Sequence, residues 1–250
     1  MATWGYVVVG LFLPLFPLSM AFNLLFARVS QPLARAALLL AWPLAGVGLL
    51  NKLGTEVPEA VLIWALATSA LYAVRLLALR ELGTWTGFLA TSVWALLWIP
   101  AREGFELEDI ALDALGLTVP LVLLVLVTVL LNRRLGGAYT SIRDGIASSL
   151  PRMSVTLIIC LLAAVATPPF PGFFSLLSLL MLASPVNIAG LLIVWLLWSW
   201  AAARLIQGFV VGTPAQDSDA QDISLPLSWG LAMVLTVLLL SGVMLTGELL

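Results

Sequence analysis

The sequence predicts an all-α fold: a polytopic integral membrane bundle of about eight transmembrane helices, one of them broken near Pro168–Gly172. Three observations predict it. Hydrophobic residues make up 62% of the 250 residues and charged residues only 10%, with a mean hydropathy of +1.13, which is far more apolar than a soluble domain. The apolar residues fall into runs of about 20, the length that crosses a bilayer. Prolines interrupt one of these runs near its middle.

The apolar runs predict a single transmembrane domain over residues 1–250, with no soluble domain inserted in it. The first run is too long for the core of a signal peptide, so we expect it to be retained as a helix although it contains two prolines. The sixth run is long because it contains the break. The candidate spans are residues 4–27, 33–51, 59–80, 84–100, 109–131, 152–182, 187–210 and 226–247.

The break in the sixth run has a covalent cause. Each proline removes an amide donor and crowds the preceding helical turn, so Pro168, Pro169 and Pro171, followed by Gly172 and Phe173, cannot continue an α-helix. Backbone groups freed inside a bilayer cost several kcal/mol each unless protein or trapped water satisfies them. Broken helices of this kind are typical of transporters and ion-translocating bundles.

The basic residues predict how the chain sits in the membrane. With the N-terminus outside, nine of the eleven lysines and arginines fall on the cytoplasmic side, and only Lys52 and Arg102 fall outside. This split favours an even number of spans, with both termini outside a cytoplasmic membrane of bacterial type. The nine are Arg28, Arg35, Arg75, Arg80, Arg133, Arg134, Arg143, Arg152 and Arg204.

Three arginines near the ends of spans are candidate buried or interfacial charges. Arg75 lies only about 8 Å below Arg80 along the third run, a distance that a long side chain can snorkel. Arg204 lies late in the seventh run. We favour snorkelling for all three, and a buried pair or relay that involves Glu81 remains the alternative.

Acidic residues cluster in two loops, and both clusters favour solvated surface over a binding site. Asp113 lies close enough to the outer end of the fifth run for contact with water. The outer cluster, alternatively a cation vestibule or docking patch, is Glu103, Glu106, Glu108, Asp109 and Asp113; the cytoplasmic one, alternatively a surface for a basic partner, is Asp217, Asp219 and Asp222.

Tryptophan is abundant, with ten in the chain. Trp195 and Trp198 lie three apart on one helical face near the middle of a span, so we expect them in helix–helix packing. Six others are expected to anchor the helices at the membrane interfaces. These are Trp4, Trp42, Trp64, Trp85, Trp98 and Trp229.

Missing residue types exclude several chemistries. The chain has no histidine, its only cysteine is Cys160 and its only lysine is Lys52. These counts exclude a bis-histidine haem, an iron–sulfur cluster, a Cys/His zinc site, a Ser-His-Asp triad and an internal disulfide. We therefore expect no cofactor, no metal site, no catalytic residue and no nucleic-acid partner, and expect that the chain is not an enzyme by itself.

Residues 132–215 resemble part of the antiporter-like membrane subunits of respiratory complex I, Mrp antiporters and membrane-bound hydrogenases. In that family a cytoplasmic loop ends in a pair with proline, a helix of about 15 residues follows, and the chain then breaks and restarts at Gly-Phe. The quoted matches are Leu150-Pro151, Thr167-Pro168-Pro169, Gly172-Phe173-Phe174-Ser175, Trp200-Ala201-Ala202-Ala203-Arg204, Gly208-Phe209 and Gly212-Thr213-Pro214.

The sequence departs from this family in two respects. Family members have about 14 helices in two inverted repeats, so a chain with about eight spans is truncated and holds at most one repeat. The family also has a titratable lysine or glutamate after the Gly-Phe-x-Ser/Gly motif, where this chain has Leu176. The resemblance therefore implies the fold of the family without its ion relay.

Three functions remain open at this stage. The favoured one is a non-catalytic or accessory subunit of a larger complex I-like, proton- or cation-coupled assembly, with other membrane subunits and a peripheral catalytic subunit as partners. The second is the membrane partner of a zinc carbonic-anhydrase-like subunit in energy-coupled uptake of inorganic carbon. The third is a stand-alone secondary transporter that works through the broken helix.

Overall fold

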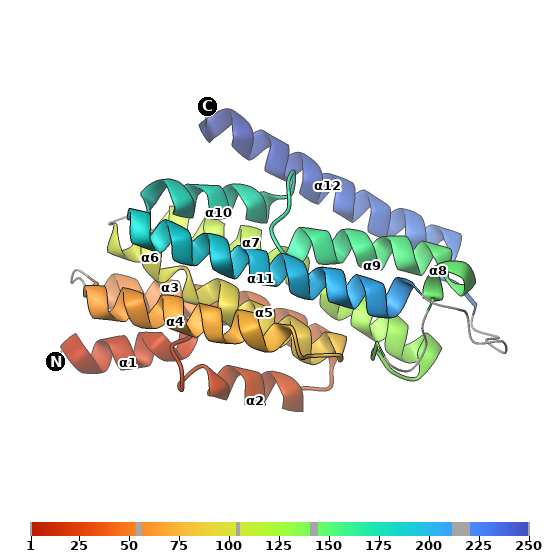
Figure 1. Cartoon of the computed structure of the whole chain (residues 1–250), viewed down its shortest axis with the longest axis horizontal. Coiled ribbons are helices and arrows are strands. Elements are labelled where there is room, and N and C mark those ends of the chain that lie inside the picture. The colour runs from red at the N-terminus through yellow and green to blue at the C-terminus, as the bar shows by residue number, and fades with distance from the viewer. Residues whose placement is uncertain (1, 54–56, 104–105, 141–144, 212–220, 250) are drawn as a thin grey trace.

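The computed structural model describes residues 2–53, 57–103, 106–140, 145–211 and 221–249, and these residues form an elongated bundle of helices (Figure 1). Most helices run nearly parallel or antiparallel to one axis, as expected for a bundle that spans a membrane. Several residues named above lie outside the described ranges, namely Arg143, residues 212–214, Asp217 and Asp219.

The chain passes along the bundle eight times, which confirms the predicted fold class. Six passes are long apolar helices that could each cross a membrane, and two are broken. The unbroken passes are α3 (Pro32–Leu53), α4 (Glu59–Leu76), α5 with α6 (Leu82–Ala95, Trp98–Arg102), α7 (Leu107–Leu135), α11 (Pro185–Val210) and α12 (Leu225–Leu249). The broken passes are α1 with α2 (Ala2–Phe12, Met20–Arg28) and α9 with α10 (Pro151–Ala164, Pro171–Leu182); the short α8 (Ile146–Ser149) precedes α9.

The first pass differs from the single helix predicted over residues 4–27. α1 ends at Phe12 and α2 begins at Met20, with Pro14 and Pro17 between them. The prediction of one continuous helix was wrong here, because two prolines three residues apart end the helix. In the sixth run the predicted break is confirmed, since α9 stops at Ala164 and α10 starts at Pro171.

The pass formed by α5 and α6 lies at the centre of the bundle, and nearly all of its residues are buried. Trp85 and Trp98 are therefore fully buried, and their predicted role as interfacial anchors is wrong. The surrounding α2, α4 and α7 pack against α5 and keep these rings away from lipid and water. Trp229 on α12 is 72% exposed, as an anchor requires.

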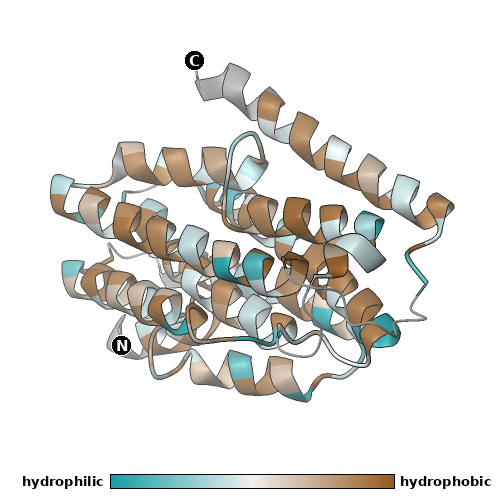
Figure 2. Ribbon diagram, turned by 45° about the vertical axis from the view of Figure 1, so that its right-hand side comes forward, coloured by the Kyte–Doolittle hydropathy of each residue, from teal (hydrophilic) through white to brown (hydrophobic). Residues whose placement is uncertain are grey.

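α12 lies on the outside of the bundle and diverges from it towards the C-terminus (Figure 1). Hydrophobic residues predominate along the helices, including α12 (Figure 2). Exposed large apolar side chains are common on these surfaces. In a chain that spans a bilayer, lipid covers such surfaces, so the exposed apolar area is that of a membrane bundle.

The basic side chains separate between the two ends of the bundle. α2, α4, α7 and α11 end, and α3 and α9 begin, at one end (Figure 1). We call this the arginine-rich end, after Arg28, Arg35, Arg75, Arg80, Arg133, Arg134, Arg152 and Arg204. Lys52 and Arg102 lie at the opposite end, where α3 and α6 end and α7 begins.

Candidate functional site

The break between α9 and α10 follows from its residues. After α9 ends, Ala166 adopts a left-handed backbone with φ of 55°, a conformation that residues with a side chain seldom adopt. Pro171 occupies the first turn of α10, where a missing amide costs nothing because helical amides there have no partner. The direction of the chain is thus reset within the six residues 165–170.

Protein groups donate hydrogen bonds to two carbonyl oxygens at the end of α9, those of Val165 and Leu162. The indole Nε1 of Trp195, on α11, donates to the carbonyl oxygen of Val165 at 3.0 Å. Thr167 returns to the end of α9, where its amide and hydroxyl donate to the carbonyl oxygen of Leu162 at 3.2 and 2.9 Å. These bonds remove the cost of unpaired backbone in a bilayer. The predicted packing role of Trp195 is thereby given a specific partner.

Glycines on two neighbouring helices approach the break closely. A Cβ added to Gly242 of α12 would lie only 2.1 Å from the carbonyl oxygen of Pro169. On α7, a Cβ at Gly116 would lie 3.0 Å from the hydroxyl oxygen of Ser175. α7 and α12 can therefore contact the broken segment only because these two positions lack side chains.

The motif residues predicted from the sequence surround this close contact. Pro171 and Gly172 are buried, Phe173 is half-buried with its ring 6.0 Å from that of Trp195, and Pro168 is exposed. Pro169 is half-buried, and Leu176, the substituted position that follows the motif, is 1% exposed. Leu176 is thus an ordinary core side chain on α10 and places no charge beside the break.

Asp113 lies closer to the break than its place in the sequence suggests. Its side chain is half-buried, which still allows the expected contact with water, and it lies six residues, or about 9 Å, into α7. The Ser175 hydroxyl of α10, which packs against Gly116 one turn later on α7, lies within reach of the Asp113 carboxylate. Glu108 and Asp109, nearer the start of α7, are exposed. The signal in the sequence was a carboxylate inside the apolar run that begins at Leu107.

The three candidate arginines are all exposed at the arginine-rich end. The guanidinium of Arg75 lies 5.3 Å from the centre of the Phe88 ring, an arrangement that favours a cation. Arg80 and Arg204 line one small cleft. The carboxylate of Glu81 accepts a hydrogen bond from the amide of Gly83 and caps α5.

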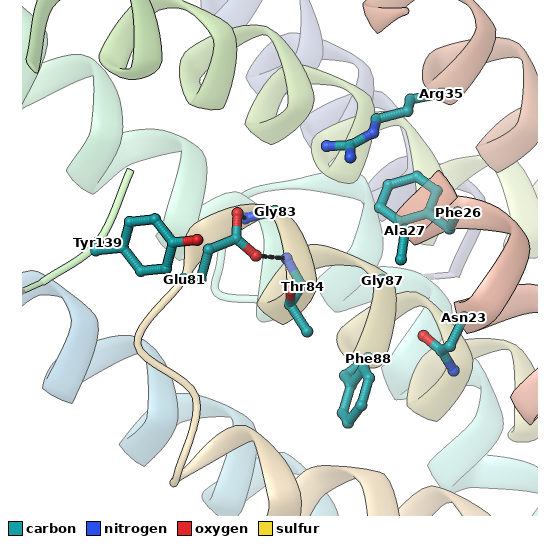
Figure 3. A pocket seen from close by; sticks show the side chains of 10 residues that line it. All are labelled: Asn23, Phe26, Ala27, Arg35, Glu81, Gly83, Thr84, Gly87, Phe88 and Tyr139. Carbon is teal, nitrogen blue, oxygen red and sulfur yellow. Dashed lines mark hydrogen bonds between the residues drawn. The ribbon is translucent and has the colours of Figure 1, made fainter. Parts of the chain in front are cut away.

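A second polar feature is a cavity of about 240 Å³ at the arginine-rich end, between α2, α3 and α5 (Figure 3). Arg35, Glu81, Tyr139 and Asn23 contribute its polar lining. Its charged groups are already engaged: Nε of Arg35 donates to the carbonyl oxygen of Val29 at 2.6 Å, and Glu81 caps α5. No local sequence pattern predicts that Arg35 and Glu81 lie together, because they are far apart in the chain.

Asp222 has a structural role that the acidic-loop interpretation did not include. Its carboxylate accepts hydrogen bonds from the amides of Arg152 and Met153 at 2.9 and 3.2 Å. These amides belong to the first turn of α9, where free N–H groups and the helix dipole favour a carboxylate. Asp222 therefore ties the segment before α12 to the start of the broken pass.

No protein-family model matches the sequence, and a comparison with curated proteins finds no relative. Solved structures do match. A chain of respiratory complex I from Thermus thermophilus with bound NADH superposes with a TM-score of 0.80 and 20% identity, over 97% of this chain and 54% of that chain. The chain has the fold of a complex I-like membrane subunit.

A second solved structure agrees. A chain of the membrane-bound sulfane sulfur reductase, an archaeal respiratory membrane complex, matches with a TM-score of 0.80 and 16% identity, over 96% of this chain and 52% of that chain. The resemblance noted from residues 132–215 is thus confirmed, and the shared fold extends over nearly the whole chain. The chain spans about half the length of the chains it matches.

Proposed function

We propose that this chain is a non-catalytic membrane subunit of a larger complex I-like, cation-coupled assembly. The observation that carries the proposal is the fold, because both matched chains belong to respiratory membrane complexes. Leu176 supports an accessory role, since the buried position after the break holds a side chain that cannot titrate. In this role the chain packs beside subunits that conduct ions and helps to hold a peripheral catalytic subunit.

We also propose the orientation that the sequence favours, in a bacterial-type cytoplasmic membrane with both termini outside. The arginine-rich end then faces the cytoplasm, in line with the positive-inside rule. Engineered single cysteines test this, with Cys160 replaced by serine. Cysteines at Arg28 and Asn132 should react with a membrane-impermeant maleimide only after the cells are opened. A cysteine at Lys52 should react in intact cells. Reaction of all three sites before lysis would overturn the orientation.

Purification of the tagged chain from native membranes tests the function. We expect antiporter-like membrane subunits and a redox module to copurify in fixed ratio. A zinc-containing hydratase in place of a redox module would support uptake of inorganic carbon instead. A chain that purifies alone, and transports a substrate in vesicles, would support a secondary transporter. Both of these results would contradict the proposal.

A further inference from the structure

We infer that Asp113, with Ser175 of the broken pass, forms a cation-binding site that takes up a proton or a sodium ion from the end of the bundle where α7 begins. The inference goes beyond the proposed function and does not depend on it. It starts from the chemistry of a carboxylate placed within a membrane span, where an unpaired charge is costly and a bound cation removes the cost.

The geometry brings two faces together. Asp113 and Gly116 are three residues apart on α7 and share a face, as do Gly172 and Ser175 on α10. Because Gly116 has no side chain, α10 approaches until Ser175 Oγ would lie 3.0 Å from a Cβ at that position. One turn earlier on α7, the Asp113 carboxylate lies within reach of the same hydroxyl. Close packing at the break thus places a hydroxyl next to the carboxylate.

The surrounding charges do not neutralise Asp113. Among the described residues, no lysine or arginine forms an ion pair with it. Asp109, one turn earlier on α7, adds a like charge. Arg102 of α6 pairs with Glu59 at 3.9 Å, and Lys52 in the last turn of α3 is exposed. A carboxylate with a like charge nearby and no basic partner attracts a cation.

The other helices packed around the site add no charge near it. α5 and α10 contain no charged residue, and neither do the described side chains of α12. Apart from the exposed Glu108 near the start of α7, the remaining charged groups of α3, α9 and α7 lie at the arginine-rich end, far along the bundle axis, and they are Arg35, Arg152, Arg133 and Arg134. The cation would therefore be held by the carboxylate and the hydroxyl.

The site also lies much closer to one end of α7 than to the other. Asp113 lies about 9 Å from the start of a helix of 29 residues that is about 43 Å long. Leu176, next to Ser175, is apolar and buried. A cation bound at Asp113 would therefore exchange most directly with the end of the bundle where α7 begins, and its titratable neighbour Asp109 lies still closer to that end.

An apolar carbodiimide, dicyclohexylcarbodiimide, tests the site in native membranes that contain the whole assembly. The protonated carboxyl adds across one C=N bond of the reagent, its oxygen bonds to the central carbon and its proton passes to nitrogen. The adduct rearranges to a stable N-acylurea, which peptide mass spectrometry detects. We expect Asp113 to be labelled and the label to be lost in Asp113→Asn. Asp109→Asn is the matched control and should keep it, because Asp109 is exposed.

Two further measurements examine which cation the site binds and how Ser175 contributes. Protection by sodium at constant pH would assign a sodium ion, and labelling that depends on pH but not on sodium would assign a proton. Ser175→Ala removes the donor that stabilises the carboxylate, so the labelled fraction at neutral pH should rise. Asp113 left unlabelled at every pH, or labelling unchanged in Asp113→Asn, would overturn the inference.

Discussion

The two broken passes face the same physical problem, and they satisfy it with the same kind of side chain. In the first pass, indole N–H groups donate to the carbonyl oxygens of Leu11, Leu13 and Phe16 at 3.0, 3.1 and 2.6 Å. The donors are Trp42 of α3, Trp98 of α6 and Trp64 of α4, in that order. In the second pass, Trp195 does the same for Val165.

The passes differ in what lies beside the break. The first is held by three indoles and by Thr68, whose hydroxyl oxygen accepts from the amide of Phe16 at 3.0 Å. Its remaining polar neighbours are neutral, such as Ser19 and Tyr72, which are 2.9 Å apart. The second has one indole, close glycine contacts and the carboxylate of Asp113. A broken pass can therefore be held by packing and neutral hydrogen bonds alone. Of these two passes, the second has a carboxylate beside it that can bind a cation.

The largest effect is expected at the contact between α12 and the second break. Gly242→Ala would place a Cβ 2.1 Å from a backbone oxygen that cannot rotate away. We expect α12 to be displaced and the folded state to lose about 3 kcal/mol, measured by unfolding in detergent. Gly230→Ala, on the same helix with open space around it, is the control and should be neutral. Equal stability of the two variants would contradict this packing.

The next largest effect is expected where tryptophan side chains hydrogen-bond to the first break. Trp98→Phe keeps most of the ring but leaves the buried carbonyl oxygen of Leu13 without its donor, so we expect a loss of about 2 kcal/mol. Trp85→Phe is a matched control, because the buried Nε1 of Trp85 has no hydrogen-bond partner. Its loss should be clearly smaller in the same unfolding assay. A larger loss for Trp85→Phe would show that ring packing, not the hydrogen bond, holds the break.

A smaller effect is expected at the second break. Trp195→Phe should cost about 1 kcal/mol, because the half-buried indole supplies one of several contacts there. Thermal unfolding of Trp195→Phe and Trp98→Phe side by side would measure the difference between the two passes. A greater loss for Trp195→Phe would reverse the comparison.

The smallest effect is expected at Leu176. Leu176→Met conserves volume in the core, so stability should change by less than about 1.5 kcal/mol. The activity of the copurified assembly should stay unchanged, since neither side chain titrates. Lost cation coupling with normal assembly would show that this position does take part in ion transfer.

Much of the fold was predictable because it depends on local composition. Apolar runs of span length and the Pro168–Gly172 motif give the eight passes and the second break. The first break was missed because its stability comes from Trp64, Thr68 and Trp98, which are remote in sequence. The burial of Trp85 and Trp98 depends on α5 being central, and no local pattern indicates that. Likewise, Asp113 meets Ser175 only through the approach of α7 to α10 at Gly116.

Ion flux through the purified chain alone tests the central claim most directly. In proteoliposomes that contain no other polypeptide, the account predicts no proton or sodium movement above that of empty vesicles. The reason is that Asp113 lies near one end of α7 and that Leu176, next to Ser175, is a buried apolar side chain that cannot pass on a proton. Sustained flux that Asp113→Asn abolishes would contradict the accessory role and make this chain a transporter in its own right.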